Sequence, residues 1–203
     1  MARNLNAKHR LCRRVGEKLC GLDKCPAVRR PYPPGVHGPT SRRRLTGYGI
    51  QLLEKQKAKT VYGILERQFS RYVFAAGKSK GNTSEMLVRT LELRLDNAVY
   101  RLGFARTRSG ARQMVGHGHF TVNGRKVTVP SIQLRSGDVI GIRPESKGRK
   151  FFEGIEEKLS QIELPPWITF DASSMTAKVI GMPTIADAKP LFDPKAIVEF
   201  YSR

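Results

Sequence analysis

Acidic side chains are scarce in this chain of 203 residues, which has 17 Asp and Glu against 37 Lys and Arg and a formal net charge of +20. The sequence has no apolar run long enough to span a bilayer and no basic amphipathic stripe typical of a helix on a membrane surface. Its first ten residues have no apolar signal-peptide core. We therefore expect a cytoplasmic protein with no membrane partner.

Signatures of catalysis are missing as well. Ser109 does not lie in a G-x-S-x-G setting, and no glycine loop fits the phosphate-binding pattern G-x-x-x-x-G-K. His117 and His119 have no acidic neighbour in the sequence, so they are better explained as phosphate or sugar contacts than as catalytic bases. We assign no catalytic residue, no small-molecule substrate and no enzymatic activity.

The positive charge is unevenly distributed and needs a counter-charge, which nucleic acid supplies by exchanging its condensed counterions for Lys and Arg. Residues 1–44 hold 12 basic and 2 acidic residues, and residues 89–150 hold 13 and 4. Residues 151–203 hold 5 and 8, so the end of the chain is mildly acidic. A basic front and an acidic end are typical of a surface that faces a polyanion.

The pattern of apolar residues predicts mostly helices in the first half of the chain. Residues 1–44 contain five prolines and no helical period, so they predict an extended basic N-terminal arm. Helical spacing begins at Gly47, and Asn82 followed by Glu85 predicts a capped helix start. The expected helices cover about 47–62, 65–76, 82–102, 106–117 and 153–162.

Short strands are expected in the second half. Asn123-Gly124 is the strongest hairpin signal in the chain, and Pro130 restricts the second strand of this hairpin to a sheet edge. The apolar tail Ile197–Tyr201 is expected to pack back on the chain. Helices followed by a small antiparallel sheet give an α+β fold. The expected strands are Phe120–Val122, Val127–Val129, Asp138–Ile142, Ile168–Asp171 and Ala177–Gly181.

One short segment, Arg101–Lys126, concentrates basic side chains on a helix and a hairpin with few acids between them. Arg108 and Arg112 are four residues apart and therefore share a helix face, and guanidinium groups suit bidentate contacts with phosphate. Gly116 and Gly118 allow the backbone to approach a ligand closely. RNA contact explains this clustering better than a solvated basic helix face.

The middle of the chain resembles a known RNA-binding module. The matching residues are Leu93–Phe104, Ala111–Val115 and Gly118–Gly124, with Gly137-Asp138 at the end. They look like the small module named after the fourth protein of the small ribosomal subunit, which also occurs in some pseudouridine synthases, tyrosyl-tRNA synthetases and heat-shock proteins. By itself, the module implies only an RNA-binding protein.

Other segments extend the resemblance to nearly the whole chain. Arg30–Gly38 resembles the N-terminal arm of that ribosomal protein, Leu53–Lys57 with Tyr62–Phe69 resembles its helical domain, and Val198–Arg203 matches its C-terminus. The chain is thus similar to the bacterial-type ribosomal protein S-four family. An RNA-modifying enzyme anchored by the module would need a catalytic domain, and a stress protein that binds stalled ribosomal particles would not explain the arm or the ending.

The resemblance implies a domain plan and a function. It implies a basic arm over 1–44, a helical domain over 45–88 plus about 184–203, and an inserted domain over 89–183 with the RNA-binding module at about 93–150. It implies a structural constituent of the small ribosomal subunit that binds small-subunit rRNA at a multi-helix junction, nucleates assembly of the subunit body and contributes to translational accuracy. The implied partners are this rRNA, neighbouring ribosomal proteins, chiefly the fifth, and messenger RNA near the channel by which it enters.

Charge clustering and the resemblance together give the candidate RNA-contacting residues. Tyr32 and His37 lie among arginines, where aromatic rings stack on unpaired bases, although packing of Tyr32 on the neighbouring prolines is an equal alternative. Asp96 is expected to pair with a neighbouring Arg and to order the module. The candidates are Arg3, Arg10, Arg13, Arg14, Arg29, Arg30, Tyr32, His37, Arg42, Arg43, Arg44, Lys55, Lys57, Arg67, Arg101, Arg106, Arg108, Arg112, Gln113, His117, His119, Asn123, Arg125 and Lys126.

The arm also holds a candidate metal site, because His9, Cys12, Cys20 and Cys25 form the pattern H-x2-C-x7-C-x4-C. Cytosolic cysteine clusters favour metal over disulfides, and four such ligands in two close pairs suit tetrahedral zinc. Some members of the resembled family have a four-cysteine zinc site in this arm, whereas here His9 stands in the place of the first cysteine and the gap between the pairs is shorter. The alternative is an arm ordered by RNA alone. We predict zinc, whose binding would supply folding free energy to an arm with little apolar core.

Overall fold

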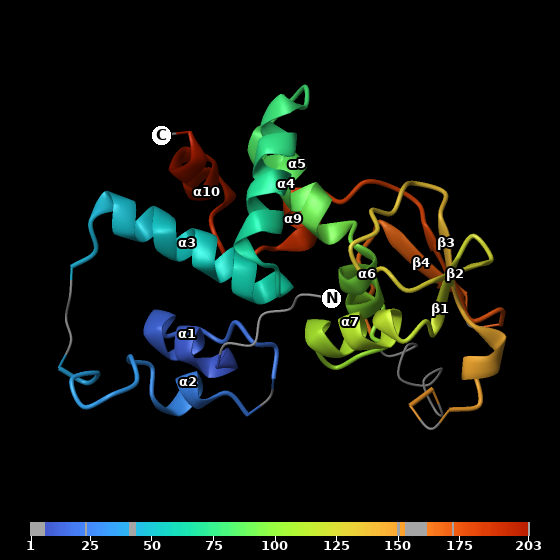
Figure 1. The fold of residues 1–203 in the computed structure, drawn as a ribbon, viewed down its shortest axis with the longest axis horizontal. Helices are drawn as coiled ribbons and strands as arrows, with labels where there is room; N and C mark the ends of the chain where they lie inside the picture. The colour runs from blue at the N-terminus through green and yellow to red at the C-terminus, as the bar shows by residue number, and fades with distance from the viewer. Residues whose placement is uncertain are drawn as a thin grey trace. The chain divides into compact units, whose positions relative to one another are not determined.

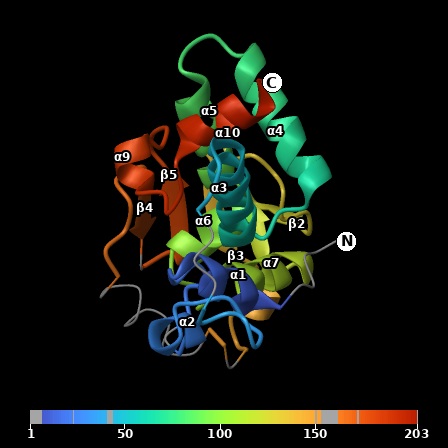
Figure 2. The same ribbon diagram turned by 90° about the vertical axis from the view of Figure 1, so that its left-hand side faces the viewer.

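The computed structural model describes residues 7–22, 24–40, 44–149, 151–152, 162–171 and 173–202. Within these ranges the chain forms helices and one five-stranded antiparallel sheet (Figures 1 and 2), so the α+β prediction is confirmed. The chain divides into two compact units, one formed by residues 1–87 with 190–203 and the other by residues 88–189. No helix in the described part of the chain is long and apolar enough to cross a membrane.

The first unit is helical. Its helices are α1 (Lys8–Val15), α2 (Pro26–Arg29), α3 (Gly47–Tyr62), α4 (Glu66–Lys78) and α10 (Pro194–Tyr201), and α5 (Thr83–Glu92) begins in it. The second unit holds α6 (Leu95–Arg101), α7 (Arg108–Gly116), β1 (Phe120–Val122), β2 (Arg125–Val127), β3 (Val139–Ile142), η1 (Pro144–Ser146), β4 (Ile168–Asp171), β5 (Thr176–Val179) and α9 (Ile185–Ala188).

The C-terminal helix α10 packs against α3, as Figures 1 and 2 both show. Ile197 of α10 is fully buried. The Gln51 side-chain amide donates to Glu199 at 2.9 Å, and the Asp193 backbone N–H donates to Glu54 at 2.8 Å. The apolar tail therefore packs back on the chain, as the sequence predicts.

The prediction of an extended arm is wrong for the segments that form α1 and α2. Gly16 ends α1 in a left-handed conformation, with φ of 81° and its N–H bonded to the Cys12 carbonyl. Pro26 is the first residue of α2, where its missing N–H costs nothing. Buried Leu19 and Ala27 give this segment a small apolar core that the proline content of the sequence conceals.

The single helix predicted from Asn82 to Leu102 is instead two helices, α5 and α6, because its middle residues pair with a distant segment. The Leu93 carbonyl accepts from the Leu134 N–H at 2.8 Å, and the Leu95 N–H donates to the Ile132 carbonyl at 2.9 Å. Arg94 forms an isolated β-bridge with Gln133. The predicted start is confirmed, since the Asn82 side chain accepts from the Ser84 N–H at 3.0 Å.

The sheet of the second unit has the strand order β2-β1-β3-β5-β4, and every neighbouring pair is antiparallel. Asn123 and Gly124 both have positive φ, 52° and 77°, as a two-residue hairpin turn of type I′ requires. This turn pairs Val122 with Arg125, so β2 begins earlier than predicted and ends at Val127. It lies at the sheet edge, before Pro130, as predicted.

Helices α6 and α7 and the sheet enclose one apolar core in this unit. Phe104 lies at its centre, with its ring centroid 5.4 Å from that of Phe120 and 6.2 Å from that of Phe152, both edge-on. Strand β4 has the predicted bounds, and β5 overlaps the predicted Ala177–Gly181 but begins at Thr176 and ends at Val179. The predicted helix at 153–162 falls almost entirely outside the described residues, as do the candidates Arg3, Arg42 and Arg43.

Candidate nucleic-acid interface and metal site

The four candidate metal ligands come together in the first unit. His9 and Cys12 are three residues apart on α1, Cys20 lies in the following loop, and Cys25 is the residue before α2. Their ligand atoms all lie within 4.8 Å of one another. Cys12 and Cys25 are buried, and none of the three cysteines forms a disulfide.

The cluster fits a tetrahedral metal ion. Cys25 Sγ lies 3.6 Å from His9 Nδ1, and ordinary zinc–sulfur and zinc–nitrogen bond lengths separate two such atoms by about 3.6 Å in a tetrahedron. One imidazole and three thiols form a donor set that zinc binds. Burial, together with neighbouring Cys20 and Cys25, raises the pKa of Cys12 to about 11, so a metal ion must displace a proton there.

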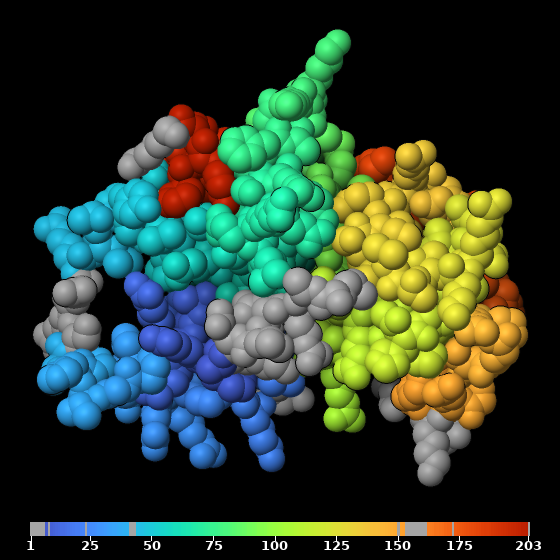
Figure 3. Space-filling view, in the orientation of Figure 1, coloured from blue at the N-terminus to red at the C-terminus, as the bar shows by residue number. Residues whose placement is uncertain are grey.

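The guanidinium of Arg13 holds the proline-rich segment against α1. It donates to the carbonyls of Tyr32 and Pro33 at 3.2 and 3.4 Å, and it lies 5.1 Å from the centre of the Tyr32 ring. One face of Tyr32 thus contacts a cation of the same chain. Figure 3 shows long side chains of this N-terminal segment, in blue, projecting into solvent.

Two candidate lysines of α3 are buried in ion pairs. Lys55 lies 3.1 Å from Glu66 and 4.3 Å from the centre of the Phe200 ring. Lys57 lies 2.9 Å from Glu54 and 3.4 Å from Glu17. Both positive charges are thus paired with carboxylates of the first unit, which argues against their contact with RNA phosphates.

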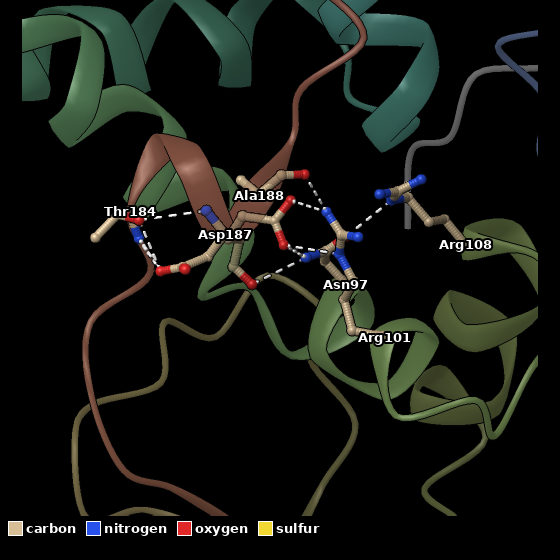
Figure 4. Close-up of polar contacts among 7 residues, drawn as sticks. Asn97, Arg101, Arg108, Thr184, Asp187 and Ala188 are labelled. Carbon is tan, nitrogen blue, oxygen red and sulfur yellow. Dashed lines mark hydrogen bonds and ion pairs between the residues drawn. The ribbon is translucent and has the colours of Figure 1, made fainter. Parts of the chain in front are cut away.

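The buried carboxylate of Glu92 accepts hydrogen bonds from two side chains of α6 in the second unit (Figure 4). Glu92 is fully buried and accepts two bonds from Arg101, at 2.9 and 3.0 Å, and one from the Asn97 amide at 2.9 Å. Arg101 also donates to the Ala188 carbonyl at 2.8 Å. This bidentate pair commits most of the Arg101 donors within the protein.

The start of α9 is fixed at the same place. The Thr184 hydroxyl and the Asp187 carboxylate bond each other's backbone N–H groups in a capping box, which Figure 4 shows beside the Arg101 contact. Arg101 thus connects α6 to a firmly capped turn nearly ninety residues later in the chain.

Asp96 pairs with arginines, as predicted. It lies 2.7 Å from Arg94, which is fully buried, and 3.1 Å from Arg112 of α7. Because Asp96 lies on α6 and Arg112 on α7, their ion pair joins the two helices.

Arg108 is held by two neighbours. Its Nε donates to the Asn97 side-chain oxygen at 2.8 Å, and its guanidinium lies 4.4 Å from the centre of the Tyr100 ring. Because the Asn97 amide nitrogen is committed to Glu92, its oxygen must face Arg108. The start of α7 therefore presents a pre-oriented guanidinium.

The hairpin presents two exposed cations, Arg125 and Lys126, next to a structural asparagine. The Asn123 amide donates to Asp138 at 2.9 Å, and its oxygen accepts from the Val139 N–H at 2.9 Å. A side chain at Gly118, where φ is 73°, would come within 2.6 Å of the Lys126 side chain. The absence of a side chain at Gly118 thus leaves room for the Lys126 side chain.

The family of the chain follows from comparison with known proteins. Residues 3–92 match the family described as ribosomal protein S4/S9 N-terminal domain, and residues 93–140 match the S4 domain. Proteins named small ribosomal subunit protein uS4 are 48% identical in Heliobacterium modesticaldum, 47% in Caldicellulosiruptor bescii and 46% in Roseiflexus castenholzii, and each comparison covers 100% of both chains. The chain belongs to the uS4 family. The resemblance seen in the sequence is confirmed, and a uS4-family chain is a structural protein and not an enzyme.

In this uS4-family chain the candidate residues fall into three groups. Arg13, Tyr32, Arg101, Arg108 and Arg112 are partly buried, and Lys55, Lys57 and His119 are buried. The remaining described candidates are exposed, namely Arg10, Arg14, Arg29, Arg30, His37, Arg44, Arg67, Arg106, Gln113, His117, Asn123, Arg125 and Lys126.

Sequence reasoning missed several residues that build the uS4-family site. The role of Glu92 could have been inferred from its place just before the L-R-L-D-N motif, because an acid amid apolar residues needs a buried partner. His119 was expected to contact RNA, but its ring bonds Ser146 at 3.0 Å and is buried. No local pattern pointed to that contact, which joins residues 27 positions apart.

Proposed function

We propose that this protein is a structural constituent of the small ribosomal subunit that binds the small-subunit rRNA directly. The observation that carries the proposal is the set of exposed cations within the S4 domain, above all Arg106, Arg125 and Lys126. The exposed arginines of the N-terminal segment supply a second set of phosphate contacts. As a uS4 relative, the protein is cytoplasmic and ribosome-bound.

The contacts have two roles. Exposed Arg and Lys side chains bind phosphates and fix the position of the protein on the RNA. Shape gives the specificity, because a folded RNA helix hides its base edges in a deep and narrow groove. The internal pairs of Arg94, Arg101 and Arg112 keep the surface that carries the phosphate contacts rigid.

The finer parts of the function follow from the family resemblance. We propose that the protein binds at a multi-helix junction of the rRNA, nucleates assembly of the subunit body and contributes to translational accuracy. Its proposed protein partner is chiefly the fifth protein of the small subunit, and messenger RNA passes nearby at the channel by which it enters. Mapping crosslinks in assembled subunits on both RNA and protein tests these placements together.

We further propose that His9, Cys12, Cys20 and Cys25 hold one zinc ion, which would supply folding free energy to the segment around α1 and α2. Elemental analysis of purified protein should find one zinc per chain, and Cys12→Ser should release it. Serine is nearly isosteric with cysteine, so Cys12→Ser removes one thiol ligand with little change in packing. Absence of zinc from carefully prepared ribosomes would refute the proposal.

The rRNA proposal is tested with full-length protein and transcribed small-subunit rRNA across about 50 to 200 mM salt. The double variant Arg125→Ala, Lys126→Ala should weaken binding and reduce the salt slope by up to about two, since each phosphate contact contributes nearly one. Lys178→Ala is the matched control, because this exposed lysine lies on β5 within the more acidic end of the chain. An unchanged slope in the double variant would remove the hairpin from the interface.

A second test examines the whole particle. A structural constituent should sediment with small subunits after a high-salt wash, whereas a transient factor should be released. Release of the wild-type protein under conditions that retain other structural proteins would refute the proposal.

A further inference from the structure

The surface around His119 combines an exposed aromatic ring with two arginines. We call the group formed by His117, His119, Arg143, Arg149 and Phe151 the His119 surface. Its centre is fixed by two bonds, from the His119 ring to the Ser146 hydroxyl at 3.0 Å and from the Arg143 N–H to the His119 carbonyl at 2.9 Å. In Figure 3, residues 143–149 and 151–152 form part of the orange surface of the second unit.

Phe151 is the unusual member of this surface, because 43% of it is exposed in a highly charged protein. Its ring centroid lies 4.7 Å from that of buried Phe152 and 5.0 Å from that of His119. Phe152 in turn packs edge-on against Phe104 and Phe120 in the core. Phe151 is therefore braced from within, while part of its ring faces solvent.

Two arginines belong to the same surface as this ring. Burial, together with neighbouring Arg149, His117 and Arg143, lowers the pKa of His119, which favours an uncharged imidazole against the Phe151 ring. Arg149 and His117 are exposed, and Arg143 pairs with exposed Glu145. Exposed Arg149, two residues before Phe151 in the chain, thus brings a positive charge to the surface on which the Phe151 ring packs against His119.

We propose that Phe151 stacks on an unpaired base of the rRNA, with Arg149 and His117 facing the phosphates on either side of that base. This inference rests on the proposed function, and it adds a stacking site for a single-stranded nucleotide at Phe151, which is not among the RNA contacts predicted from the sequence. The ring supplies the face on which a base stacks, and stacking is independent of base identity.

The charges decide between a base and an apolar side chain of a neighbouring protein. An apolar partner would desolvate the exposed Arg149 guanidinium without compensation. A nucleotide brings an apolar base face and a negative phosphate together, which matches an aromatic ring bordered by guanidinium groups. Single-stranded loops and bulges of RNA present such unstacked bases.

The test uses full-length protein and transcribed small-subunit rRNA. Phe151→Ala should weaken binding about tenfold, in the range measured for one base–aromatic stack, and leave the salt slope unchanged because phenylalanine contacts no phosphate. Phe151→Leu should weaken binding nearly as much, since it keeps apolar volume without a ring. Phe74→Ala is the matched control, because this phenylalanine of α4 is 59% exposed and belongs to the other unit.

Phe151→Trp supplies a direct signal. It should retain affinity, and its fluorescence should be quenched on rRNA binding above the constant background of Trp167, which is the only tryptophan of the chain and is 2% exposed. Chemical probing should reveal one nucleotide that wild-type protein protects and Phe151→Ala leaves reactive.

The outcomes are distinct. Wild-type binding with Phe151→Ala within twofold of Phe74→Ala refutes the stacking site and leaves the proposed function intact. Failure of the wild-type protein to bind rRNA refutes the proposed function itself. Loss of a neighbouring protein from subunits assembled with Phe151→Ala, with rRNA affinity unchanged, assigns the surface to a protein partner and overturns the inference.

Discussion

Replacement of Glu92 by alanine should strongly destabilise the second unit. The carboxylate is fully buried and accepts bonds from Arg101 and Asn97. Its removal leaves the Arg101 guanidinium without its counter-charge. Only 26% of the Arg101 side chain is exposed to solvent, so water cannot fully replace that charge. Removing one partner of a buried pair costs about 3–5 kcal/mol. With a urea dependence of about 1–3 kcal/mol per molar, the unfolding midpoint should fall by roughly 2 M.

Trp167 fluorescence in urea measures this loss, because the only tryptophan lies in the core of the same unit. Glu145→Ala is the matched control, since it breaks an exposed pair with Arg143 and should cost less than about 1 kcal/mol. The double variant Glu92→Leu, Arg101→Leu should recover most of the loss, as apolar replacement of both partners is often neutral. A midpoint for Glu92→Ala equal to that of Glu145→Ala would refute the reasoning.

Three further predictions concern the other elements. Burial would raise the pKa of Glu66, but hydrogen bonds from neighbouring Lys59, Tyr201 and Lys55 outweigh it and lower the pKa from 4.5 to about 2. The stabilisation by the Glu66 carboxylate is therefore present above pH 4.5 and lost as the pH falls towards 2. Glu66→Gln should make the stability of the first unit less dependent on pH in that window, as measured by circular dichroism during acid unfolding. Gly118→Ala should cost about 1–2 kcal/mol in urea melts, because φ there is 73° and the new methyl group meets Lys126. Lys57→Ala should lower stability yet leave the salt slope of rRNA binding unchanged, since its charge pairs with carboxylates within the protein.

Much of the fold could be predicted because it depends on local signals. The Asn123-Gly124 turn requires positive φ at both positions, and the two residues adopt it. Thr107 caps α7 by accepting from the Gly110 N–H, close to the predicted start. Apolar spacing located α3, α4 and most of the strands.

The incorrect helix predictions arise where contacts between distant residues outweigh the local sequence pattern. Leu95 continues the four-residue spacing of Leu87 and Leu91, but the carbonyl of nearby Leu93 accepts a bond from Leu134, forty-one residues later, and the helix breaks. The helices around Cys12 and Cys25 were missed because prolines and charges dominate that segment, whereas a few buried residues and the converging cysteines shape it. Neither effect can be read from neighbouring residues alone.

The candidate site shows a limit of charge as a guide to function. Arg106 and Arg112 look equivalent in the sequence, yet Arg106 is exposed and Arg112 pairs with Asp96. Both signs of charge contribute to this arrangement, because the buried carboxylates of Glu92 and Asp96 pair with Arg101, Arg94 and Arg112. The exposed arginines can therefore bind phosphate, whereas the paired arginines hold together the helices on which they lie. Because acidic residues are scarce, the loss of Glu92 or Asp96 should have the largest effect. Removing either buried carboxylate would destabilise the second unit and leave an arginine without its counter-charge.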